Sequence, residues 1–141
     1  MGRRYKIRTT APEPYCPKIN IANRLEIAND IKMKVARYYA KKKWGVNFEI
    51  GLTRQGKLRA DILAMALNGY IVIVETKSSV SDYKNDLKWR NYLPFCNQFY
   101  FAFNVNTWTK LKDSIDLPTA AGVFVIDHST KTINIVKKSK K

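Results

Sequence analysis

The stretch that decides the fold runs from position 59 to 82 and reads RADILAMALNGYIVIVETKSSVSD. Two apolar runs in it are joined by Asn68 and Gly69, a pair typical of tight β-hairpin turns. The stretch therefore predicts two antiparallel strands, over 58–67 and 70–79.

Three charged residues interrupt these apolar strands. Glu75 and Lys77 are two positions apart, so their side chains point to the same face of the second strand. The hairpin brings Asp61, near the start of the first strand, toward Glu75. Charges on an inward face are costly unless something pairs with them. Either the three residues form an ion-pair network at a sheet edge, or the two carboxylates hold a divalent cation such as Mg²⁺.

The rest of the chain fits around this hairpin. The residue spacing predicts a helix over 19–43, a strand over 46–53, a helix over 82–93 stopped by Pro94, and a strand over 98–104. A short helical turn over 107–115 and strands over 122–127 and 132–136 follow. The strands on either side of the 82–93 helix should be parallel with a right-handed crossover. The fold class is therefore α/β, a mixed central sheet flanked by helices.

One domain accounts for this pattern. We expect it over 18–136, preceded by an extended basic arm over 1–17 and followed by a solvated lysine-rich tail over 137–141. The hydrophobic fraction of 45% supports a folded chain. No apolar stretch is long enough to cross a membrane, and Cys16 and Cys96 are too far apart in sequence to suggest a zinc site. We expect a cytoplasmic protein with reduced thiols.

Charge points to the partner. The 141 residues include 26 basic and 11 acidic side chains, for a net charge of +15. Such an excess attracts polyanions, and DNA or RNA is the favoured partner over a membrane surface. Charge alone would suit a structural nucleic-acid-binding protein equally well.

Asp61 followed by the VETK run resembles the motif of the PD-(D/E)XK nuclease superfamily, with Asp61, Glu75, Thr76 and Lys77 at the D, E, X and K positions. Ala60 stands where the proline of that motif would be. The wider text from 59 to 103 resembles the MmcB-like DNA repair nucleases, with RAD, IVIVE-x-KSS, D-x-KW-x-x-Y and FC in order. The resemblance implies a restriction-endonuclease-like αβββαβ core, which is the element order predicted above. It also implies Mg²⁺-dependent cleavage of DNA, with Mn²⁺ able to substitute.

The resemblance also implies roles in the site. Asp61 and Glu75 would hold the metal together with the backbone carbonyl of Thr76, and Lys77 would orient the attacking water. A further ligand would be Glu26, on the first helix, or Glu49, on the strand beside Asp61.

The segment after the motif supplies candidate DNA contacts. Lys84, Lys88 and Tyr92 recur every four residues, so they would share one face of the 82–93 helix. The Lys88-x-x-x-Tyr92 spacing resembles the Gln-x-x-x-Tyr motif of RecB-like nucleases, although a solvated basic face would look the same. Ser78 and Ser79 would bind phosphate or cap the helix.

The function that follows is a metal-dependent DNA nuclease, an endonuclease acting in repair or recombination. One alternative is a Holliday-junction resolvase of the same fold, for which we expect a homodimer. The other is a non-catalytic nucleic-acid-binding protein. The intact set of Asp61, Glu75 and Lys77 argues against the second alternative, because two acids facing phosphate weaken binding. His128, in a turn, is expected to be a surface residue.

Overall fold

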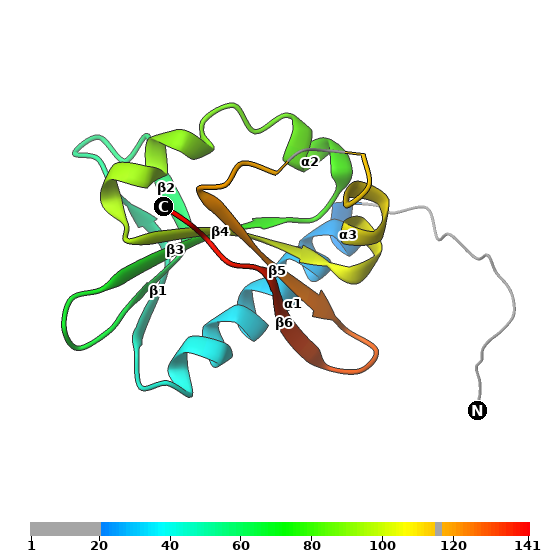
Figure 1. Ribbon diagram of the computed structural model, residues 1–141, viewed down its shortest axis with the longest axis horizontal. Coiled ribbons are helices and arrows are strands. Elements are labelled where there is room, and N and C mark those ends of the chain that lie inside the picture. The colour runs from blue at the N-terminus through cyan, green and yellow to red at the C-terminus, as the bar shows by residue number, and fades with distance from the viewer. Residues whose placement is uncertain (1–20, 115–116) are drawn as a thin grey trace, which may run out of the picture.

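A computed structural model describes residues 21–114 and 117–141, so the predicted arm over 1–17 lies outside the described residues. Six strands form one sheet in the order β1-β2-β3-β4-β5-β6, with helices on both faces (Figure 1). The described elements are α1 (Ile21–Ala40), β1 (Gly45–Gly51), β2 (Arg59–Met65), β3 (Ile71–Lys77), α2 (Val80–Lys84), the 3₁₀ helix η1 (Trp89–Phe95), β4 (Gln98–Asn104), α3 (Val105–Leu111), β5 (Ala121–Asp127) and β6 (Thr132–Lys137). None of these helices is both long and apolar enough to span a membrane.

The sheet has the predicted mixed topology. The first three strands form an antiparallel meander, β3, β4 and β5 run parallel, and β6 returns antiparallel. The predicted hairpin between β2 and β3 is present, but its connection spans residues 66–70 and the turn is centred on Leu67 and Asn68, one residue earlier than expected. Gly69 has φ of 88°, a left-handed conformation that glycine adopts without strain. The architecture is the restriction-endonuclease-like αβββαβ core, extended by α3 and the last two strands.

One face of the sheet is covered by α1, which lies across it in Figure 1. Ile31, Val35 and Tyr39 recur every four residues and are buried, as the amphipathic spacing predicts. They pack on side chains of the central strands, among them Tyr100 and Phe124. This layer anchors the helix that the sequence places first.

The other face is covered by α2 and η1. Its core is largely aromatic: Trp89 stacks on Phe99 at 5.6 Å between ring centroids, and Tyr83 meets Phe101 edge-on at 5.0 Å. Aromatic rings bury large apolar areas and prefer these geometries. The two short helices are therefore held by side-chain packing more than by their own length.

The predicted helix over 82–93 is wrong. Instead α2 ends after five residues at Lys84, residues 86–88 are not helical, and the 3₁₀ helix η1 contains Pro94 rather than stopping before it. The cause is the carboxylate of Asp86, which accepts hydrogen bonds from the backbone N–H of Lys88 at 3.0 Å and from Lys77 Nζ at 2.7 Å. Short acidic side chains that bond nearby backbone compete with helix formation in this way.

The expected solvated tail is also wrong for part of its length. Lys137 belongs to β6, and Ser139 is only 5% exposed. The hydroxyl of Ser139 donates to Ala120 O at 2.6 Å and accepts from the backbone N–H of Phe99 at 3.3 Å. The chain after β6 thus runs back along the sheet toward β4 (Figure 1).

Candidate active site

The site is built around an irregularity in β2 at Asp61. Ala60 packs in the core beneath η1, whereas Ile62, which in a regular strand would share its face, packs in the core beneath α1. On β1, Glu49 lies between the partners of these two residues, opposite Asp61, and has φ of 50°. A left-handed conformation is strained for any residue except glycine, and such strain gathers at functional sites. Both strands therefore change faces at the level of Asp61.

Asp61 and Glu75 are brought together, as predicted. The β2–β3 pairing ends at Ile62 and Val74, and beyond it side chains replace the backbone bonds. Glu75 Oε2 accepts a hydrogen bond from the N–H of Asp61 at 2.8 Å. In return, Asp61 Oδ2 accepts from the N–H of Thr76 at 2.8 Å and from its hydroxyl at 3.0 Å. Each carboxylate is thus positioned by the strand that carries the other.

The surroundings of the two acids favour their protonated forms. The pKa of Glu75 is raised to about 8, chiefly by burial and then by the neighbouring Asp61 carboxylate. The hydrogen bond from the N–H of Asp61, the charge of Lys77 and Tyr92 oppose the shift in part. Burial also raises the pKa of Asp61, against the hydrogen bonds from Thr76. Two carboxylates this close resist ionising together unless a positive charge joins them. The pair is therefore arranged to gain from a cation.

Lys77 shares the face of Glu75, as predicted, and both side chains are buried. Its ammonium group forms an ion pair with Asp86. Sequence reasoning missed Asp86, although it is the acid of the D-x-KW stretch. The signal was available in that stretch, but no role was predicted for Asp86.

Tyr92 does not face solvent beside Lys84 and Lys88. It is 2% exposed, and its hydroxyl donates to the carbonyl of Arg59 at 2.9 Å. It also lies close enough to Glu75 to lower the pKa of that carboxyl. Lys84 and Lys88 are exposed on separate, non-continuous segments. The prediction that Lys84, Lys88 and Tyr92 share one helical face is therefore wrong. Tyr92 instead lies in the core, beside the acids of the site.

The two serines after Lys77 bond within the chain. Ser79 caps α2, since its hydroxyl accepts from the N–H of Asp82 at 3.1 Å. The N–H of Ser78 donates to the carboxylate of Asp82 at 3.2 Å. Of the two predicted roles, the structure therefore shows helix capping, by Ser79. A contact of either serine with phosphate stays a prediction.

Of the two further acids, Glu49 lies nearer the site. Its charge raises the pKa of Asp61, and its carboxylate is paired with Lys32 at 2.8 Å. Glu26 is exposed on α1. In the part of the chain that is described, no three His, Cys, Asp or Glu side chains cluster closely enough to form a metal site by themselves.

Two carboxylates nevertheless fit Mg²⁺, which is usually bound through one or two carboxylates and keeps several water ligands. Asp61 Oδ1 makes no hydrogen bond with any described residue, so it is available to a cation. His128 is exposed, as expected, and bonds Asp30 at 3.2 Å. Cys96 is buried and has no disulfide partner among the described residues, but Cys16 lies outside them, so the reduced state of the two thiols stays a prediction.

The model of the family described as DNA repair protein MmcB-like matches residues 17–139. The chain belongs to the MmcB-like family. The match includes every predicted site residue, from Glu26 to Tyr92, and nearly all of the described fold. No curated protein matches this MmcB-like chain.

Solved structures resemble this MmcB-like protein across most of its length. A protein of unknown function from Silicibacter pomeroyi is 26% identical with a TM-score of 0.67, over 80% of this chain and 71% of that one. An XisH family protein from Nostoc punctiforme is 19% identical, with a TM-score of 0.53 over 74% and 96% of the two chains. An fdxN element excision controlling factor protein from Anabaena variabilis is 20% identical, with a TM-score of 0.54 over 77% and 99%. The last two likenesses show the fold alone.

Proposed function

We propose that this MmcB-like protein is a cytoplasmic, metal-dependent nuclease that hydrolyses phosphodiester bonds of DNA, as an endonuclease in repair or recombination. The observation that carries the proposal is the reciprocal bonding of Asp61 and Glu75 with Lys77 two residues further on. A purely structural network would be expected to place Lys77 between the two acids. Here the lysine pairs with Asp86, so the two neighbouring acids are left to share a cation.

Each residue of the site would have its own role. Asp61, Glu75 and the Thr76 carbonyl would hold Mg²⁺ or Mn²⁺. When bound, the ion supplies an activated water and neutralises charge that develops on the phosphate. Thr76 orients Asp61 through its N–H and hydroxyl. Tyr92 lies against Glu75 from within the core.

Lys77 would act as a positive charge beside the attacked phosphate. Asp86 holds its ammonium group at the end of β3 and compensates its charge while no phosphate is present. Asp86 also accepts a hydrogen bond from the backbone N–H of Lys88. The carboxylate that holds Lys77 is therefore itself fixed in position. Preorganised charge of this kind needs no rearrangement when the reaction occurs.

The decisive experiment incubates the protein with labelled duplex, single-stranded, flap and four-way DNA, each with Mg²⁺, Mn²⁺ or EDTA. Glu75→Gln is the matched control, since it keeps the shape of the side chain and removes its charge. We expect metal-dependent cleavage by the wild type and none by the variant. Absence of cleavage of all four substrates with both metals, while binding persists, would favour the non-catalytic alternative. Paired, symmetric cuts in the four-way substrate by a dimer would instead favour the resolvase.

A further inference from the structure

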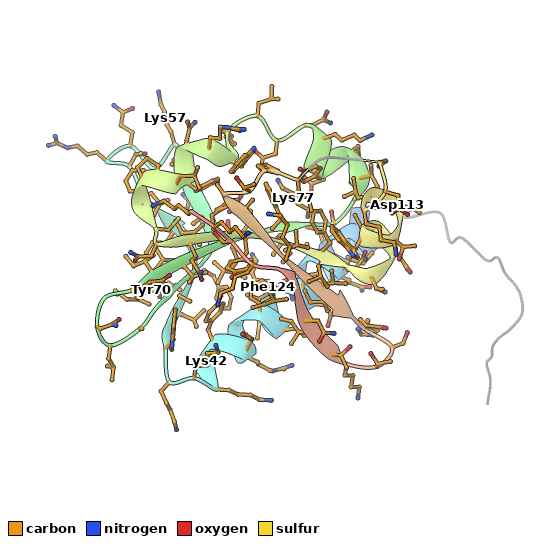
Figure 2. The ribbon with its side chains drawn as sticks, viewed as in Figure 1. Lys42, Lys57, Tyr70, Lys77, Asp113 and Phe124 are labelled. Atoms are coloured by element: carbon orange, nitrogen blue, oxygen red, sulfur yellow. The ribbon has the colours of Figure 1, made fainter. Side chains whose placement is uncertain are left out.

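A cleft of about 590 Å³ opens between the β1–β2 turn and η1. Four cationic side chains line it, Arg54 and Lys57 from the turn and Lys88 and Arg90 from the segment that begins η1. No acidic side chain in the described part of the chain lines it. Lys57 projects from the periphery of the molecule in Figure 2, whereas Lys77 lies within the fold. The cleft therefore concentrates positive charge at a distinct place on an already basic surface.

The lining is not only charged. Leu58, Pro94 and Phe95 contribute apolar surface, and Phe95 is 39% exposed, unusually open for a phenylalanine on a folded chain. Phosphates alone need no aromatic surface. Cations that follow a backbone together with a ring on which a base can stack are the combination that binds single-stranded nucleic acid.

Covalent and hydrogen-bonded links join the cleft to the candidate active site. Leu58 directly precedes β2 and lies three residues before Asp61. Lys88, on the other wall, donates its N–H to Asp86, whose second oxygen holds Lys77. A DNA strand whose phosphate lies at Asp61 and Glu75 could therefore continue into the cleft.

We propose that this cleft binds an unpaired nucleotide next to the scissile phosphate, with the base on Phe95 and the flanking phosphates on the four cations. Its substrate is then DNA with a single-stranded segment, such as a flap, a gap or a frayed end. A base held in continuous duplex cannot reach an apolar surface inside a cleft. The inference rests on the proposed function for its chemistry, but the binding it describes requires no cleavage.

The test measures binding by fluorescence anisotropy in EDTA, so that nothing is cut. The ligands are a short single-stranded thymidine oligonucleotide, an abasic strand with the same number of phosphates, and a duplex of the same length. We expect the oligonucleotide to bind most tightly. Phe95→Ala should weaken its binding about tenfold, the scale of one stacked base, and leave abasic binding unchanged. Thermal melting of Phe95→Ala checks the fold, and Phe95→Tyr, which keeps a ring, should retain the affinity.

Charge is tested with matched double variants. Arg54→Gln with Lys57→Gln removes two cations from the cleft, and Lys110→Gln with Lys112→Gln removes two from the end of α3, outside it. We expect only the cleft variant to flatten the salt dependence of binding, by about 0.7 for each single-strand phosphate that is no longer neutralised.

Equal affinity of the wild type for thymidine and abasic strands would overturn the proposal, as would equal effects of the two charge variants. Duplex binding as tight as single-strand binding would overturn it too. The proposed function would fail differently. In that case the protein would not cleave DNA in the presence of metal, while the binding results described above would still be obtained.

Discussion

The ammonium group of Lys77 lies 2.7 Å from Oδ2 of Asp86, and both side chains are almost wholly buried. The pair joins the last residue of β3 to the segment between α2 and η1, nine positions later. It fixes the lysine of the candidate site and also ends the preceding helix. Breaking it tests both consequences.

Asp86→Ala should lower the free energy of unfolding by about 3 kcal/mol, because removing one partner leaves a buried charge uncompensated. Urea denaturation measures this decrease. Asp113→Ala, at an exposed position after α3, is the control and should change stability little. The double variant Lys77→Met with Asp86→Leu should recover most of the stability, since no buried charge remains. A stability of Asp86→Ala equal to that of wild type would mean that the pair is exposed to water in solution.

The metal-free protein should become less stable as pH rises from about 5 to about 8. Glu75 has a folded pKa of about 8 against an ordinary value of 4.5, so the folded state binds the proton more tightly in this window. Linkage makes stability fall wherever the folded state holds more protons than the unfolded state. Urea unfolding in EDTA across the window measures the trend, and Glu75→Gln should flatten it.

Added Mg²⁺ should raise the thermal midpoint more at the upper end of that window than at the lower end, because carboxylate ligands must be deprotonated. An equal shift at both ends, or the same shift in Glu75→Gln, would contradict the assignment of Glu75 as a ligand.

Tyr92→Phe should cost about 1 kcal/mol, since it removes the hydrogen bond from the buried side chain of Tyr92 to the carbonyl of Arg59. We also expect the cleavage rate at saturating protein to fall while DNA affinity stays the same, because Tyr92 lies against Glu75 rather than facing solvent. Single-turnover cleavage separates these two quantities. A decrease confined to affinity would return Tyr92 to the DNA-contacting surface predicted from the sequence.

The end of the chain should separate charge from packing. Replacing Lys138, Lys140 and Lys141 with glutamine should flatten the plot of log affinity against log salt, by about 0.9 for each duplex phosphate that is no longer neutralised, without changing stability. Ser139→Ala should instead lower the free energy of unfolding by about 1 kcal/mol or more, because its hydroxyl bonds the buried N–H of Phe99 and the partly buried carbonyl of Ala120. If Ser139→Ala is as stable as wild type, this segment is not packed in solution.

Much of the fold could be predicted from the sequence because the patterns that specify it are local. Alternation in β3 places Glu75 and Lys77 on one face, and the turn that ends at Gly69 brings Asp61 to Glu75. A hairpin needs only the residues within it, so its register follows from its own sequence. The order of the remaining strands follows from short connections and the crossover rule.

Only the tertiary structure decided how the segment after β3 folds. Four-residue spacing favoured one helix, but Asp86 bonds Lys77 across the fold and the helix ends beside it. Tyr92 then turns inward, because η1 has about three rather than 3.6 residues per turn and packs on the aromatic core. The cleft lies between a turn and a helix that are far apart in the sequence, so no local sequence pattern predicts it. Long-range bonds of this kind outweigh the few tenths of a kcal/mol that separate local propensities.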